Sequence, residues 1–126
     1  MSAAVELSAL SERLEEFPSV AYLVSVDADG RPHVVAVEPV LAGDRILVGA
    51  GRRTAANLAE RAACTLLWPA PAGSGYGLLV DGVAEVVGDG DARRLVVRPT
   101  GAVLHRTPTG DPSLPSCVAV PTGLAR

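Results

Sequence analysis

The sequence predicts a mainly β protein with minor α, built as a small closed or half-closed antiparallel barrel. Short apolar runs with strand-like alternation fill residues 19–106, and Gly, Pro and Asp turns separate them. Helical spacing is found before residue 18 and again in a short segment after residue 51. With 126 residues and no linker or internal repeat, the chain is predicted to form one domain, 1–126.

The N-terminal helix is predicted over residues 3–17, within a segment 1–18. One apolar stripe has helical spacing and consists of Leu7, Leu10, Leu14 and Phe17. Pro18 ends the helix, because a residue that precedes proline is disfavoured in the helical conformation.

Six strands follow in the prediction. They are 19–27, 33–40, 45–50, 64–68, 76–87 and 93–106. A short helix precedes the fourth strand, and the C-terminal segment 107–126 is predicted to be a loop with a short last strand at 116–120. The first three strands lack room for crossover helices, so we expect an antiparallel meander, with a turn at Asp29-Gly30. A bulge is expected at Asp81-Gly82, and Pro99 indicates an edge position or a bulge in its own strand.

Composition excludes several functions. All eleven basic residues are arginine, so neither a Schiff-base lysine nor a phosphate-binding P-loop lysine is available. A formal net charge of −3 argues against a general nucleic-acid binder. Any bound anion must therefore be held by arginine, by backbone N–H groups or by hydroxyls.

Location and metal content are also constrained. The first twenty residues lack the basic start and apolar run of a signal peptide, and no apolar stretch reaches the roughly 18 residues of a membrane span. We therefore expect a cytoplasmic protein without a membrane partner. Cys64 and Cys117 form no disulfide framework, and with His33 and His105 they show no metal-ligand spacing, so no metal site is predicted.

The most informative segment is the start of the second helix. Gly49 and Gly51 allow a tight turn, after which Arg52, Arg53 and Thr54 begin the helix. A helix N-terminus offers unpaired N–H groups, and two arginines add forked donors, which together suit a phosphate. The alternative is a solvated arginine pair beside a capped helix. A Rossmann turn is excluded because Thr54 occupies the third glycine position.

The order of elements and four segments resemble the pyridoxamine 5′-phosphate oxidase-like flavin-binding split-barrel family. The segments are the hairpin through Asp29-Gly-Arg-Pro-His33, the strand 34–40, Gly51–Leu58 and Cys64–Trp68. The resemblance covers about residues 5–106. It implies a six-stranded antiparallel split β-barrel, a homodimer, and FMN in clefts at the dimer interface; some branches bind the deazaflavin F420 or haem instead.

The resemblance also implies site residues. The cofactor-binding set is Glu38, Pro39, Val40, Gly51, Arg52, Arg53, Thr54, Asn57 and Trp68. Glu38 to Val40 would run beside the flavin ring, and Trp68 would lie near the cleft. The family pattern of a hydroxyl residue, a lysine two positions later and then Asn-Leu is matched here at Asn57-Leu58. Thr54 stands in the place of the lysine, and Arg53 is the residue that can replace its charge.

The leading hypothesis is therefore a flavin- or deazaflavin-dependent oxidoreductase that acts on an unknown small molecule. No catalytic residue is expected, because the cofactor itself carries the hydride. The alternative is a non-catalytic homodimer of the same fold that binds a small ligand or none. Haem handling is a third possibility.

Overall fold

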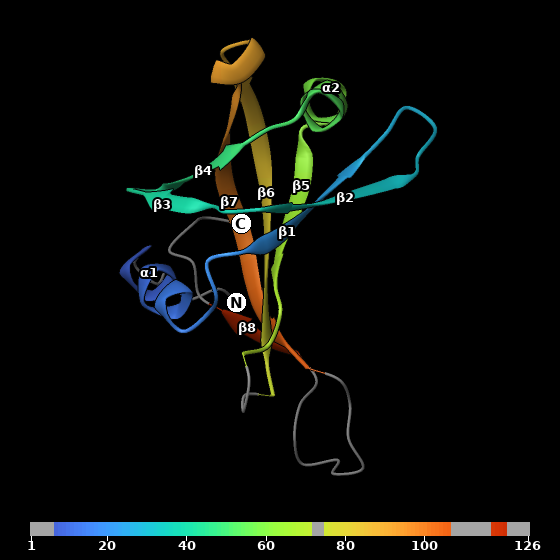
Figure 1. Ribbon diagram of the computed structural model, residues 1–126. Coiled ribbons are helices and arrows are strands. Elements are labelled where there is room, and N and C mark those ends of the chain that lie inside the picture. Colours follow the sequence, from blue (N-terminus) through green and yellow to red (C-terminus); the bar gives the residue numbers. More distant parts are fainter. Residues whose placement is uncertain (1–6, 72–74, 107–116, 121–126) are drawn as a thin grey trace.

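The computed structural model describes residues 7–71, 75–106 and 117–120 (Figure 1). Its helices are α1 (Leu7–Glu15), α2 (Arg52–Glu60) and a short 3-10 turn, η1 (Gly90–Ala92). Its strands are β1 (Ala21–Val26), β2 (Pro32–Val37), β3 (Val40–Ala42), β4 (Arg45–Gly49), β5 (Ala63–Trp68), β6 (Gly77–Val87), β7 (Arg94–His105) and β8 (Cys117–Val120). The described part of the chain holds no helix with the length and apolar character needed to cross a membrane.

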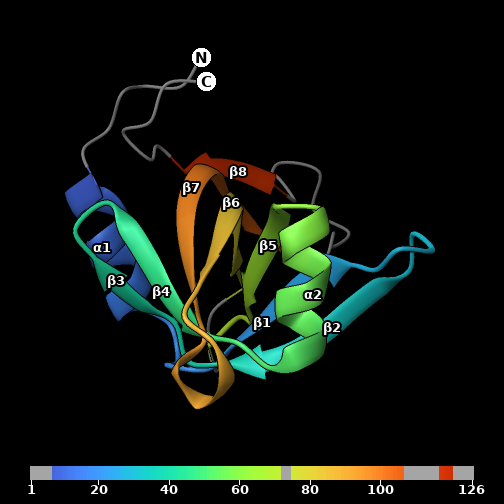
Figure 2. The ribbon, with the colours of Figure 1, turned by 90° about the horizontal axis from the view of Figure 1, so that it is seen from above.

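All strand pairs are antiparallel, and the order is β2-β1-β5-β6-β7-β4-β3, with β8 also paired to β7. The sheet curls without closing, as a split barrel does (Figure 2). The predicted fold class is thus confirmed, although the described residues contain eight strands rather than six. The predicted strand 33–40 is divided into β2 and β3, and β8 lies within the predicted last strand.

The expected meander of the first three strands is wrong. After β2, which pairs with β1, the chain passes through Glu38 and Pro39 and joins the opposite edge of the sheet as β3. Pro39 has no N–H group, so it cannot continue a strand ladder. The apolar alternation continues across this break, which is why the sequence pattern conceals it.

The predicted bulge is confirmed where β6 pairs with β7. The register shifts between Asp81 and Gly82, so that Asp81 faces Gly101 while Gly82 faces Pro99. A Cβ atom on Gly82 would lie 2.6 Å from Val97 Cγ1 and 2.9 Å from the Arg98 carbonyl oxygen, so this position requires glycine. Pro99 lies beyond the last residue paired with β4, Val97, and before the β8 pairing begins, so its missing N–H group disrupts no ladder on that side.

Helix α1 begins the described part of the chain at Leu7 and ends at Glu15, two residues before the predicted end; predicted residues 3–6 lie outside the described residues. Leu10 is fully buried against the sheet. Helix α2 packs against β1 and β6 and contributes Leu58 to the same core (Figure 2). The two helices therefore pack on different sides of one hydrophobic core.

Candidate functional site

A hollow of about 470 Å³ lies at the N-terminus of α2. One wall is the link between β4 and α2, Gly49–Arg52, and the other is the β6–β7 turn with Gly90, Asp91, Arg93 and Arg94. The strand register brings the walls together, because Arg94 pairs with Gly49 of β4 and with Val87 of β6. We call this cavity the α2 hollow.

The start of α2 supplies hydrogen-bond donors to this hollow. Gly51 is the N-cap residue, has extended backbone (φ −74°, ψ 171°) and makes no side-chain cap. Its carbonyl oxygen accepts the first helical hydrogen bond, from the Ala55 N–H group at 3.0 Å. The N–H groups of the first turn have no acceptor inside the helix, and the helix dipole adds partial positive charge there. An anion can therefore be bound by backbone alone at this point.

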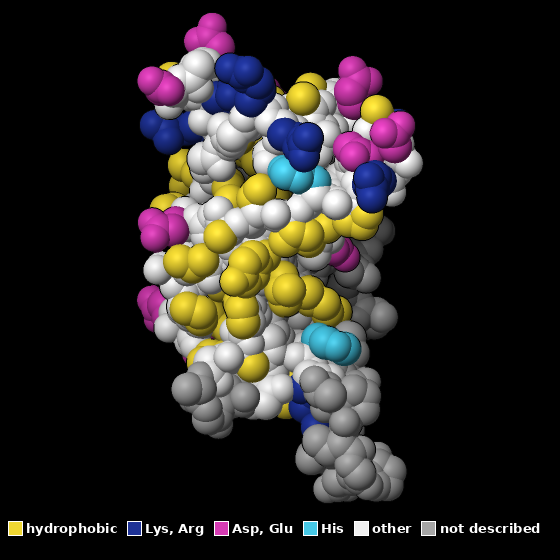
Figure 3. All heavy atoms as spheres, turned by 45° about the vertical axis from the view of Figure 1, so that its right-hand side comes forward, with side chains coloured by type: hydrophobic (Ala, Val, Ile, Leu, Met, Phe, Trp, Pro, Cys, Tyr) yellow, Lys and Arg dark blue, Asp and Glu magenta, His cyan; other side chains and the backbone are white. Residues whose placement is uncertain are grey.

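Arginine side chains add to this positive potential. Arg52, Arg93 and Arg94 are among the residues that line the α2 hollow, and Asp91 is the one acidic residue among them. Between described residues, ion pairs join Arg13 to Glu16 and Arg45 to Asp44, so neither involves the arginines of this hollow. Charged side chains gather toward the end of the molecule that carries α2 and the β6–β7 turn (Figure 3). The arrangement suits a phosphate group, which arginine binds through two parallel hydrogen bonds.

The predicted residues of α2 point in different directions. Gly51 and Arg52 line the α2 hollow, and Arg53 is exposed beside it. Thr54 and Asn57 are buried instead, and the Asn57 Nδ2 group donates a hydrogen bond of 3.1 Å to Ser25 Oγ of β1. Asn57 therefore joins the helix to the sheet, and its predicted role toward a cofactor stays a prediction.

The remaining predicted residues lie elsewhere. Pro39 and Trp68 line a second hollow of about 320 Å³ beside α1, which shares no lining residue with the α2 hollow. Trp68 is only 3% exposed, whereas Val40 is 60% exposed and Glu38 is also at the surface. A single chain thus does not gather the nine predicted residues into one cavity.

Sequence reasoning missed Asp91, Arg93 and Arg94. The only local signal was a second arginine doublet beside a glycine- and aspartate-rich turn, about forty residues after the first doublet. Nothing in the spacing relates the two doublets. The pairing of β7 with both β4 and β6 decides that they share one cavity.

Cys64 is buried on the inner side of β5. Burial first, and then the nearby carboxylate of Asp81, raise the pKa of its thiol to about 11. The thiol therefore stays protonated near neutral pH and is a poor nucleophile. No cluster of three or more metal-ligating side chains occurs among the described residues.

Comparison with known proteins shows the family of this chain. The sequence model of the pyridoxamine 5′-phosphate oxidase family matches residues 9–119. Uncharacterised proteins of Mycobacterium bovis and Mycobacterium tuberculosis are each 43% identical in an alignment 120 positions long, which covers 85% of this chain and 84% of theirs. The chain belongs to the pyridoxamine 5′-phosphate oxidase family.

Solved structures share the fold. An F420 reductase is 22% identical, with a TM-score of 0.60 over 72% of this chain and 94% of that one. A Clostridium acetobutylicum protein related to general stress protein 26 is 14% identical, with a TM-score of 0.63 over 79% and 87%. The heme storage protein HutZ of Vibrio cholerae is 17% identical, with a TM-score of 0.58 over 78% and 94%. The same fold thus occurs in a protein named for F420 and in a protein named for haem.

Proposed function

We propose that this protein binds a flavin-type cofactor, FMN or F420, and acts as an oxidoreductase on a small molecule. The observation that carries the proposal is the meeting of Arg52, Arg93 and Arg94 at the uncapped N-terminus of α2. Membership of the pyridoxamine 5′-phosphate oxidase family and the fold shared with an F420 reductase support the same cofactor class.

The residues present fit the phosphate end of such a cofactor. The first-turn N–H groups of α2 and the guanidinium group of Arg52 would bind the phosphate from one wall, and Arg93 and Arg94 from the other. Asp91 limits the net positive charge of the hollow. A bound flavin or deazaflavin supplies two-electron hydride chemistry, so the chain has to position the cofactor rather than provide an acid or base.

A titration that contrasts FMN with riboflavin tests the phosphate site, because riboflavin lacks only the phosphate. Visible absorbance and flavin fluorescence report binding. We expect Arg52→Ala and Arg93→Ala each to weaken FMN binding about tenfold or more, since a charge-assisted hydrogen bond contributes about 1.5–3 kcal/mol. Riboflavin binding should stay unchanged in both variants.

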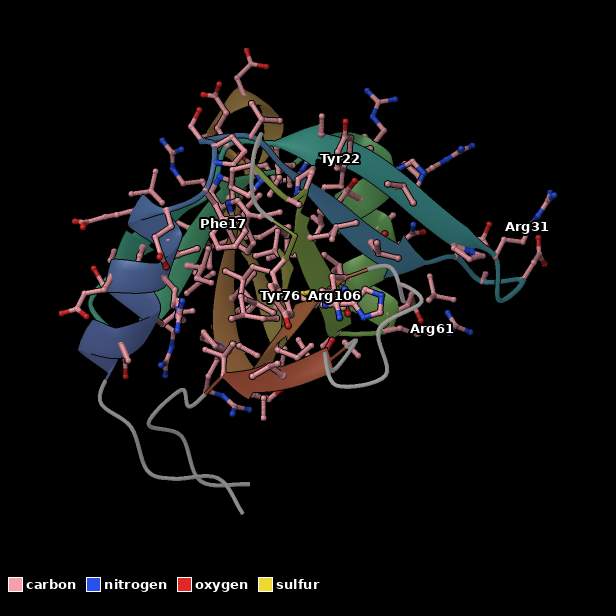
Figure 4. All side chains as sticks on the ribbon, turned by 90° about the horizontal axis from the view of Figure 1, so that it is seen from below. Phe17, Tyr22, Arg31, Arg61, Tyr76 and Arg106 are labelled. Atoms are coloured by element: carbon pink, nitrogen blue, oxygen red, sulfur yellow. The ribbon has the colours of Figure 1, made fainter. Side chains whose placement is uncertain are left out.

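Arg31→Ala is the matched control, because Arg31 lies at the tip of the β1–β2 hairpin, away from the α2 hollow (Figure 4). The same titration is repeated with F420 and with haemin. If none of the three gives a bound spectrum, the cofactor proposal fails and the non-catalytic alternative is favoured. A spectrum with haemin alone supports haem handling instead.

We further propose that the protein is a homodimer. A row of apolar side chains runs across the outer side of the sheet, in register from strand to strand. The row consists of Ala36, Tyr22, Leu67, Leu79 and Val103. With Val34 and Val83, which are also exposed, it forms the outer face, seen as an apolar band in Figure 3. Contiguous exposed apolar surface of this kind is typical of protein interaction sites.

Light scattering at about 50 μM tests the dimer. The double variant Tyr22→Arg/Val34→Arg should be a folded monomer, because two charges would have to be buried between the copies. Ala59→Arg on the exposed side of α2 is the control and should remain dimeric. A monomeric wild-type protein would refute the homodimer, whereas the FMN titration tests the phosphate site, whose residues all belong to one chain.

A further inference from the structure

The hollow beside α1 has one helical wall and one sheet wall. Ser11, Leu14 and Glu15 are spaced i, i+3 and i+4, so they lie on one face of α1. That face looks onto Leu41 of β3 and Trp68 at the end of β5, and all five residues line the cavity. We call this cavity the α1 hollow.

The inner part of the α1 hollow is apolar and partly aromatic. Leu14, Phe17 and Leu41 are half-buried, while Trp68 is almost fully buried at its base. Phe17 lies two residues after the end of α1, and its N–H group donates a hydrogen bond of 3.1 Å to the Leu14 carbonyl oxygen, which fixes its backbone at the helix end. A volume of about 320 Å³ is at the small end of the range for ligand sites.

Charge in this cavity comes from one residue. Glu15 is the only ionisable side chain among the residues that line the α1 hollow. The neighbouring Arg13 lies on another face of the helix, where it bonds to Glu16 at 3.2 Å, and no ion pair between described residues involves Glu15. A carboxylate at the rim of an aromatic pocket favours a cation, which the ring faces also attract.

We propose that the α1 hollow binds a small apolar amine. Its hydrocarbon or aromatic body packs on Leu14, Phe17 and Trp68, and its ammonium group pairs with the Glu15 carboxylate. This site goes beyond the cofactor proposal and shares no residue with the α2 hollow, although Pro39 and Trp68 of its lining also belong to the cofactor-binding set that the family resemblance implies.

Trp68 provides the measurement, since it is the only tryptophan in the chain and lies in the cavity. Its fluorescence is followed while the protein is titrated with 4-phenylbutylamine, 4-phenylbutanol and 4-phenylbutyrate, which share one apolar body. We expect the amine to bind about threefold to fivefold more tightly than the alcohol, as for an exposed ion pair, and the acid to bind most weakly. Glu15→Gln should abolish the difference between amine and alcohol.

Two further variants test whether the amine binds inside the α1 hollow and pairs with Glu15 alone. Glu12→Gln removes a carboxylate from a different face of the same helix and should leave amine binding unchanged. Ser11→Phe fills the cavity from an exposed position, so the fold is spared, and should block all three ligands. Alcohol binding as tight as amine binding, an unchanged preference in Glu15→Gln, or no fluorescence response would overturn the proposal. Arg52→Ala should not alter the titration, which separates its failure from that of the phosphate site.

Discussion

The two faces of the sheet are built from similar side chains yet differ in their surroundings. On the inner face, one row of paired residues is almost completely buried and consists of Leu23, Leu66, Val80, Ala102 and Val120. On the outer face the adjacent row is as apolar, but Tyr22 is 41% exposed and its neighbours Leu67 and Leu79 are only half-buried.

This comparison explains why β1, β5 and the first part of β6 carry apolar side chains on both faces of the sheet. A sheet with one solvated face normally has polar residues on that side, whereas strands covered on both sides are apolar throughout. The outer face therefore has the composition expected of the interface in the homodimer proposed above. Both faces also hold side-chain hydrogen bonds between described residues, such as Asn57 to Ser25 inside and Thr65 to Asp81 outside.

The largest expected difference between the faces is in folding stability. Leu66→Ala on the inner face should lower the free energy of unfolding by about 2–5 kcal/mol, because it removes a fully buried side chain and leaves a cavity. Leu67→Ala, one position along β5, should cost clearly less. Urea unfolding followed by circular dichroism measures both, and equal losses would mean that the outer face is as well packed as the inner one.

The buried hydrogen bond should have the next largest effect. Ser25→Ala leaves the Asn57 amide without its side-chain acceptor in the interior, which we expect to cost about 1–3 kcal/mol. The double variant Ser25→Ala/Asn57→Leu should recover part of that loss, since the amide is then gone. A double variant that loses the sum of the two single changes would refute this account of the pair.

The buried Cys64 thiol on the inner face should make the free energy of unfolding depend on pH. Because its folded pKa of about 11 exceeds the ordinary thiol value, the unfolded chain loses this proton first as pH rises. The thiol therefore does not change stability below about pH 8 and favours unfolding above it, by about 1–2 kcal/mol at pH 10. Urea unfolding at pH 7 and pH 10 should show this extra loss in the wild type and not in Cys64→Ala. The same loss in both proteins would assign it to other groups.

The smallest effect is expected on the outer face. Thr65 Oγ1 donates a hydrogen bond of 2.6 Å to Asp81 Oδ1. This pair is exposed, so water can replace either partner. Thr65→Val should therefore change the free energy of unfolding of the monomer by less than about 0.5 kcal/mol. A loss comparable to that of Ser25→Ala would show that the outer pair is shielded from water.

Much of the fold followed from local sequence. The N-terminal helix, the helix after Gly51, most strands and the bulge at Asp81-Gly82 were predicted because periodicity, proline and glycine report backbone conformation directly. The route of the chain after β2 was not predictable. Pro39 signals a break, but nothing local says that the next strand joins the opposite edge.

The candidate site, like the fold, could be predicted only in part from the sequence. By itself, the sequence determined that a helix begins after Gly51 with Arg52 and Arg53 in its first turn, and it excluded lysine from the chemistry, because these depend on residue type and near neighbours. The anion site at this helix start stays a prediction. Only the tertiary structure decided that Arg93 and Arg94 complete that cavity, that Asn57 turns inward to Ser25, and that Pro39 and Trp68 belong to a separate hollow. Such contacts join residues distant in the chain, and strand pairing, which sets them, leaves no mark in the spacing of residues along it.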